Sequence, residues 1–80
     1  MKLPRNVSGQ QLAKALAVFG YVITRQTGSH MRLSTIVGGQ HHLTIPDHSP
    51  LRVGTLAAII SEVAQHSGST REDVAKRLFD

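Results

Sequence analysis

The sequence predicts an α+β domain of two layers, in which helices cover one face of a three-stranded antiparallel sheet. Three observations indicate this class: helical apolar spacing near the start of the chain, three short β-rich segments joined by tight turns, and helical spacing again in the last third. Both principal helices should cover the same sheet face, because neither has another core to pack against. The opposite face is left to solvent or to a partner.

The first predicted element is a helix over residues 8–19. Its apolar side chains recur with the i, i+3, i+4, i+7 spacing of one helical face, at Leu12, Ala15, Leu16 and Phe19. Ser8, followed three residues later by Gln11, forms a capping-box pattern, and Gly20 supplies the left-handed conformation that ends a helix.

Three strands are predicted next, over residues 21–26, 30–36 and 41–45. The turns between them contain Gly28 and the Gly38-Gly39 pair, so the strands should form an antiparallel meander. Because side chains alternate along a strand, one face receives the apolar residues of the second and third strands. The uncovered face then carries His30, Arg32 and His42.

The last part of the chain is predicted to be a loop and two helices. Pro46 and Pro50 lack the donor that a sheet ladder needs, so residues 46–54 should form a crossing loop. An apolar stripe from residue 55 predicts a helix that ends at Gly68, and Ser69 with Glu72 should cap a short helix over residues 70–79. We expect one domain over residues 1–80, with a core of residues 1–68 and a helical extension of residues 69–80.

The composition favours a polyanionic partner. Nine Lys and Arg residues against five Asp and Glu give a formal net charge of +4, which favours RNA or DNA before an acidic protein. Only three aromatic residues are present, so a platform for stacking single-stranded bases is not expected. The chain has no signal-peptide pattern and no apolar stretch of membrane-spanning length, and we expect a cytoplasmic protein, monomeric when free, without a membrane partner.

His30 is the candidate for chemistry among the five histidines. It follows Gly28, which allows backbone N–H groups to approach a phosphate, and Arg25 and Arg32 are near enough in a hairpin to hold a polyanion. An imidazole can take or give a proton near neutral pH, and RNA cleavage needs such a group beside the ribose 2′-OH nucleophile. The three-residue motif is weak, and by themselves the residues favour an exposed histidine without a particular role.

Other kinds of site find little support. His41 and His42 are adjacent in a strand and point to opposite faces, so they do not readily share a zinc ion, and no metal or cofactor is expected. The chain has no cysteine, no P-loop and no dinucleotide fingerprint. Asp47 is the only acid between the first and second helices, which excludes paired-carboxylate chemistry. His66, near a helix end, is expected to be structural.

Three segments together resemble the HicA (YcfA-like) family of bacterial toxins: "LPRNVSGQQLAKAL", "GSHMRL" and "HHLTIPDHSPLRVGTLAAII". The resemblance covers about residues 1–68. It implies a double-stranded-RNA-binding-like fold and an mRNA interferase that works without a metal and is neutralised by a HicB-type antitoxin. The catalytic histidine and turn glycine of the family correspond to His30 and Gly28. Two features depart from the family pattern: the extension of residues 69–80, and Met31, which follows the motif histidine where some members have a histidine or a basic residue.

With this resemblance, a catalytic role becomes the preferred interpretation of His30. The resemblance implies a metal-independent endoribonuclease, the toxin of a type II toxin–antitoxin system, with His30 as general base or acid. Gly28 and Ser29 should offer donors to the phosphate. The expected contacts to the RNA backbone are Lys2, Arg5, Arg25, Arg32 and Arg52. The alternative is a module that binds double-stranded RNA by shape and charge and cuts nothing.

Overall fold

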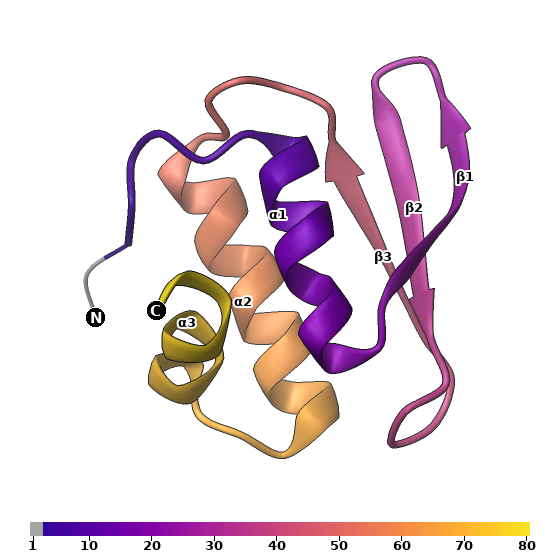
Figure 1. Cartoon of the computed structure of the whole chain (residues 1–80), viewed down its shortest axis with the longest axis vertical. Helices are drawn as coiled ribbons and strands as arrows, with labels where there is room; N and C mark the ends of the chain where they lie inside the picture. Colours follow the sequence, from indigo (N-terminus) through magenta and orange to yellow (C-terminus); the bar gives the residue numbers. More distant parts are fainter. Residues whose placement is uncertain (1–2) are drawn as a thin grey trace.

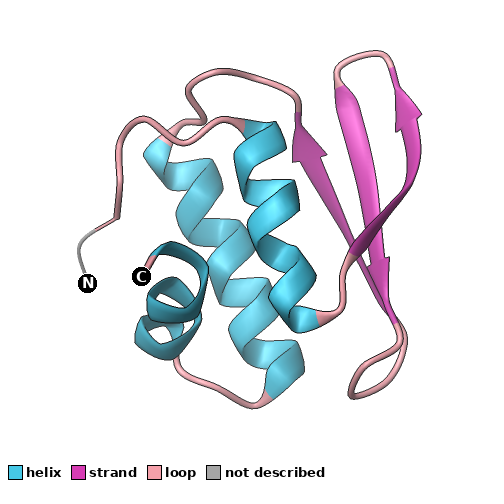
Figure 2. Ribbon diagram, viewed as in Figure 1, coloured by secondary structure: helices cyan, strands magenta, loops and turns pink. Residues whose placement is uncertain are grey.

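The computed structural model describes residues 3–80 and confirms the α+β class (Figures 1 and 2). The elements in chain order are α1 (Gly9–Ala15), the 3-10 turn η1 (Leu16–Phe19), β1 (Val22–Thr27), β2 (His30–Thr35), β3 (His41–Pro46), α2 (Val53–Ser67) and α3 (Arg71–Phe79). The sheet is antiparallel with strand order β1-β2-β3. None of the helices within residues 3–80 is long and apolar enough to cross a membrane.

The first helix begins with the capping box that the sequence predicts. The Ser8 hydroxyl accepts a hydrogen bond from the Gln11 N–H at 3.0 Å, and the Gln11 side chain accepts from the Ser8 N–H at 2.9 Å. The last turn tightens into η1, and Gly20 ends it with a φ of +84°. Gly20 also has to be glycine on steric grounds, because a Cβ there would lie 2.6 Å from a methyl group of Val37.

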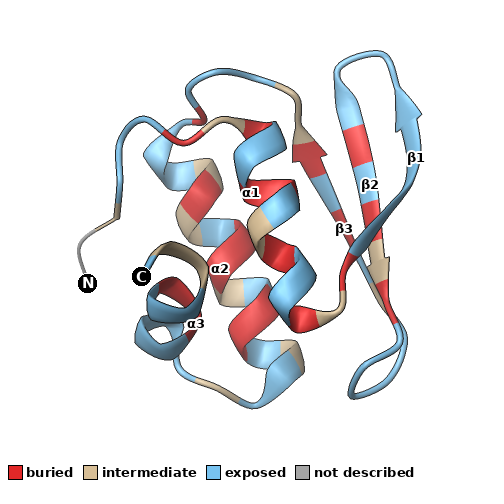
Figure 3. Ribbon diagram, viewed as in Figure 1, coloured by how far each residue is buried: buried red, intermediate tan, exposed pale blue. Residues whose placement is uncertain are grey.

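The sheet is covered on one face only, and the cover does not reach β1. Figure 1 places β3 next to α1 and β1 farthest from the helices. Accordingly Met31, Leu33 and Thr35 of β2 are buried in alternation with more exposed neighbours, whereas all six residues of β1 are exposed (Figure 3). The ladder register shifts between Ile23 and Arg25, which leaves one extra residue on the edge strand.

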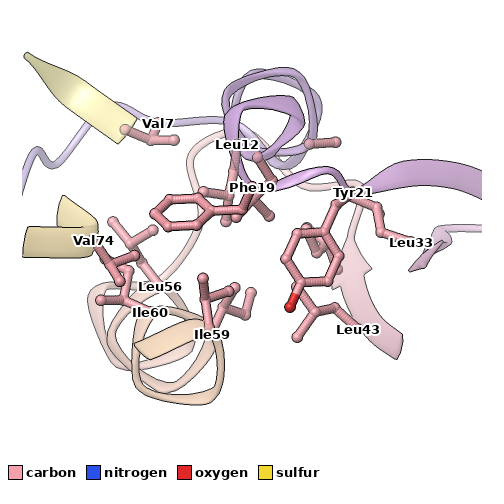
Figure 4. Packing of buried hydrophobic residues seen from close by; sticks show 14 of the residues in the cluster. Val7, Leu12, Phe19, Tyr21, Leu33, Leu43, Leu56, Ile59, Ile60 and Val74 are labelled. Atoms are coloured by element: carbon pink, nitrogen blue, oxygen red, sulfur yellow. The ribbon is translucent and has the colours of Figure 1, made fainter. Parts of the chain in front are cut away.

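The core fills the space between the helices and the covered face of the sheet. Tyr21 lies beside Leu33 and Leu43 in Figure 4, and Phe19 lies toward Val74 of α3. The fully buried side chains come from every layer: Leu12, Leu16, Tyr21, Met31, Leu33, Leu43, Ile45, Leu56, Ile60, Val63 and Val74. The last helix therefore contributes to the same core as the sheet.

Two boundaries at the loop between β3 and α2 differ from the sequence prediction. β3 extends to Pro46, which pairs with His30, because a proline is tolerated at the end of an edge strand. α2 begins at Val53, two residues early, with Arg52 as its N-cap.

The N-cap of α3 is Thr70, whereas the sequence predicts Ser69. The Thr70 hydroxyl accepts from the Asp73 N–H at 3.1 Å. Ser69 instead donates its N–H to the Ala64 carbonyl, in the turn that ends α2 at Gly68.

Candidate functional site on the open sheet face

His30 is exposed on the uncovered face at the start of β2. Its backbone pairs with Thr27 of β1 on one side and Pro46 of β3 on the other, so both neighbouring strands fix its position. The turn before it contains Gly28, with a φ of +57°, and the Ser29 carbonyl accepts a hydrogen bond of 2.7 Å from the Asp47 N–H. The imidazole thus projects into solvent from a backbone that hydrogen bonds hold on both sides.

Two arginines lie next to this histidine in the ladder. Arg25 and Arg32 are paired directly across β1 and β2, and both are exposed. Cross-strand partners point to the same face of a sheet, and like charges in such a pair destabilise it. A bound anion would relieve that repulsion.

The nearest acid in the chain does not neutralise the arginine pair. Asp47 is the only carboxylate before Glu62. Its Oδ2 accepts hydrogen bonds from the side-chain amides of Gln10, at 3.3 Å, and Gln26, at 3.1 Å. Gln26 pairs with buried Met31, so it belongs to the covered side of the sheet. The open face is left with positive charge.

At the other end of the same face a second histidine takes part in a polar network. His42 pairs with Ser34 across β2 and β3, and its Nδ1 lies 2.6 Å from the Ser34 Oγ. The Ser34 Oγ lies 3.3 Å from the Oγ1 of Thr24, which donates to the Arg32 carbonyl at 3.3 Å. Alternation alone places Ser34 and His42 on the open face, but the pairing that joins them depends on a register that the sequence does not specify.

The other predicted cations do not join this site. Arg52 precedes α2, which lies on the helical side of the molecule (Figure 1), and Arg5 lines a hollow beside Leu78 and Phe79 of α3. Lys2 lies outside the described residues. Of the predicted set, the structure therefore brings together His30, the Gly28–Ser29 turn and the two arginines of the hairpin.

His41 and His66 belong to the covered side of the sheet. Their rings stack with centroids 4.5 Å apart, His41 Nδ1 lies 2.8 Å from the Tyr21 hydroxyl, and His66 Nε2 lies 3.0 Å from the Val37 carbonyl oxygen. Burial raises the pKa of Tyr21, and the nearby negative charge of Glu62 adds to the increase. These contacts tie the end of α2 to the sheet. Within residues 3–80 no three metal-ligating side chains converge on one point.

A groove of about 690 Å³ lies between α1 and the face of the sheet that the helices cover, beside Ile23, Gln26 and Met31. Its polar lining consists mainly of amides and hydroxyls, with Lys14 as the one cation. No group there is suited to proton transfer near neutral pH. The candidate site is therefore the open face, with His30 and the two arginines.

The fold and this face define a small α+β protein with a cationic sheet surface that carries two exposed histidines. Residues 9–68, well over half of the chain, match the family model described as HicA toxin of bacterial toxin–antitoxin. The chain therefore belongs to the HicA toxin family, and it is a toxin of a toxin–antitoxin system. No curated protein and no solved structure matches it. The match ends at Gly68, so α3 lies beyond it.

Proposed function

We propose that this toxin is a metal-independent endoribonuclease that cleaves messenger RNA, with His30 as the catalytic residue. The observation that carries the proposal is the exposed imidazole of His30 beside the unneutralised pair of Arg25 and Arg32. Family membership supports it. The resemblance to this family implies an mRNA interferase whose catalytic histidine corresponds to His30. RNA is translated in the cytoplasm, which is where we expect the toxin to act.

The proposed reaction needs one proton-transfer group and a cationic surface. The ribose 2′-oxygen bonds to the adjacent phosphorus while the bond from phosphorus to the 5′-oxygen breaks. His30 as general base accepts the 2′-OH proton, and the resulting imidazolium can return a proton to the departing 5′-oxygen. The arginine pair and the N–H groups near Gly28 and Ser29 would stabilise the charge that develops on the phosphate oxygens.

The proposed protein partner is a HicB-type antitoxin. A toxin that cleaves RNA with an exposed histidine must be blocked when the cell is growing. The positive charge of the open face suits a partner with an acidic surface, because opposite charges speed association and favour the correct partner. Such a partner would cover His30 and the arginines together.

The test is to incubate purified protein with total RNA in the presence of EDTA. We expect the unchanged protein and a His48→Ala control to produce fragments, since His48 is exposed but lies in the loop after β3. The His30→Ala variant should cleave at least about a hundredfold more slowly. Equal cleavage by both variants would show that His30 is not catalytic. Salt-sensitive binding without fragments would favour the alternative, a module that only binds double-stranded RNA.

A further inference from the structure

A continuous chain of hydrogen bonds crosses all three strands on the open face. It runs from His42 on β3 through Ser34 on β2 to Thr24 on β1, and it ends at the backbone carbonyl of Arg32. The proposed cleavage reaction uses none of these three side chains. Both Thr24 and His42 are exposed, so the network is accessible to a ligand.

When all three bonds are made together, the carbonyl at the end of this chain sets the direction of each bond. A carbonyl oxygen only accepts, so Thr24 donates its single hydroxyl proton to the backbone carbonyl oxygen of Arg32. Thr24 must then accept from Ser34. Ser34, having used its own proton, must accept from His42 Nδ1. All three bonds form at once only when His42 Nδ1 carries hydrogen.

With the three bonds so directed, the neutral His42 ring presents an unprotonated Nε2. An imidazole with hydrogen on Nδ1 has its lone pair on Nε2, which can accept a hydrogen bond but cannot donate one. No hydrogen bond within residues 3–80 uses this atom. A phosphate oxygen is also only an acceptor, so the neutral ring is unsuited to phosphate and suited to a donor.

His42 is too far from His30 to act on the same phosphate. Ser34, its ladder partner, is four residues along β2 from His30, which corresponds to about 13 Å at the rise of a β-strand. Arg32 lies midway, with Arg25 opposite it. The line from His30 past the arginines to His42 is cationic and has the length of a short run of nucleotides.

We propose that His42 binds a ribose 2′-hydroxyl of a nucleotide a short distance along the strand from the cleaved one, and that it thereby selects RNA over DNA. The 2′-hydroxyl is the hydrogen-bond donor that the RNA backbone carries at every nucleotide and that DNA lacks. Ser34 and Thr24 are positioning residues, since they hold the proton on Nδ1 of His42. The proposal rests on the proposed function in taking RNA as the ligand, but it concerns binding and not cleavage.

The protonation of His42 can be tested without any substrate. Two-bond proton–nitrogen NMR correlations of the imidazoles, at mildly alkaline pH, distinguish hydrogen on Nδ1 from hydrogen on Nε2, and the His42→Gln variant assigns the signal. We expect the Nδ1–H form in the unchanged protein and a shift toward the Nε2–H form in Ser34→Ala. An Nε2–H form in the unchanged protein would overturn the proposal.

Binding is tested in the His30→Ala background, with a fluorescein-labelled RNA and a DNA of the same sequence. Adding His42→Ala should lower the ratio of RNA to DNA affinity by about threefold to tenfold, the range for one hydrogen bond. The DNA affinity should stay the same, and adding His48→Ala should leave the ratio unchanged. Single 2′-deoxy substitutions along the RNA should find one position that weakens binding only while His42 is present.

The outcomes separate this inference from the proposed function. If the unchanged protein cleaves RNA but His42→Ala does not alter the affinity ratio, His42 has no such role and the nuclease remains. If the ratio falls but no variant cleaves RNA, the selection by His42 holds and the nuclease proposal fails. If no variant prefers RNA over DNA, the inference is overturned.

Discussion

At the scale of single residues, the open face combines an energetic cost with the proposed function. Arg25 and Arg32 face each other across two strands, and the acid nearest to them in sequence is bonded to two glutamines on the other side of the sheet. A fold selected for stability alone would place an opposite charge or a β-branched residue at one of these positions. The repulsion is instead available to strengthen the binding of a polyanion.

Replacing one arginine of the pair should therefore stabilise the fold and weaken RNA binding. For Arg32→Thr we expect the free energy of unfolding to rise by about 0.5 kcal/mol at low salt, because the repulsion is removed and threonine suits a strand. The plot of log RNA affinity against log salt concentration should become less steep by about one unit of slope. Urea unfolding and fluorescence anisotropy measure the two effects.

The matched control is Arg5→Thr, which removes the same charge from a residue beside α3. It should leave the salt slope nearly unchanged. An equal loss of RNA affinity in both variants would mean that net charge, and not the arginine pair, determines binding.

Tyr21 makes stability sensitive to alkaline pH. Burial raises its pKa above the ordinary value of 10.0, so in the folded protein it keeps its proton where the unfolded chain loses it. The contribution to stability is complete below pH 10 and declines as the pH rises beyond it. Tyr21→Phe should cost about 1 kcal/mol near neutral pH, because it loses the bond to His41, and should show a smaller alkaline decline.

Urea unfolding of both proteins below and above pH 10 measures this difference. Tyr21 is the only tyrosine, so ultraviolet absorbance reports its ionisation directly. Parallel alkaline declines in the two proteins would contradict the role assigned to Tyr21.

At the scale of elements, the start of α1 packs directly against the end of β3. The Gly9 N–H donates to the His48 carbonyl at 2.9 Å, and a Cβ at Gly9 would collide with the Pro46 carbonyl oxygen. Gly9→Ala should therefore destabilise the protein by about 2 kcal/mol through backbone displacement. Gly54→Ala is the control: its Cβ would meet nothing within 4 Å, so it should stabilise α2 by about 0.5 kcal/mol. Thermal unfolding of both variants checks the opposite signs.

The elements show how far the sequence determines the fold and the site. The helical segment of α1 and η1, its capping box and the alternation of β2 and β3 follow from local patterns, although the last turn, Leu16–Phe19, is 3-10 and not α-helical. The alternation places His30, Arg32 and His42 on one face. What local patterns cannot supply is contact between distant segments. Packing decides that Gly9 contacts the end of β3 and that Arg5 and Arg52 lie away from the hairpin. The strand register decides that Ser34 is bonded to His42.

At the scale of the whole molecule, the acidic side chains are confined to the second half of the chain. Every carboxylate lies at residue 47 or later, and three of the five lie in the last nine residues, on α3 and at its end. The sheet carries the arginine pair and two exposed histidines without a carboxylate on its open face. An approaching RNA should be guided to that face, and its association rate should fall steeply with salt.

The last helix should be part of the stable core, although the family match ends before it. Val74 is fully buried, and the Arg77 guanidinium lies 4.3 Å from the centre of the Phe19 ring. Val74→Ala should lower the free energy of unfolding by about 2 kcal/mol and the melting temperature by roughly 10 °C. Lys76→Ala, an exposed change in the same helix, should have little effect. Equal melting temperatures in calorimetry would show that α3 is only loosely attached.

The exposed edge of β1 has a consequence for how the free toxin behaves in solution. One side of this strand has no neighbour within residues 3–80, and Val22 and Ile23 on it are more than half exposed. Unpaired backbone beside aliphatic side chains is a template on which another chain can add a strand. Concentrated toxin without its partner should accordingly self-associate and precipitate, and light scattering should show the particles grow with protein concentration.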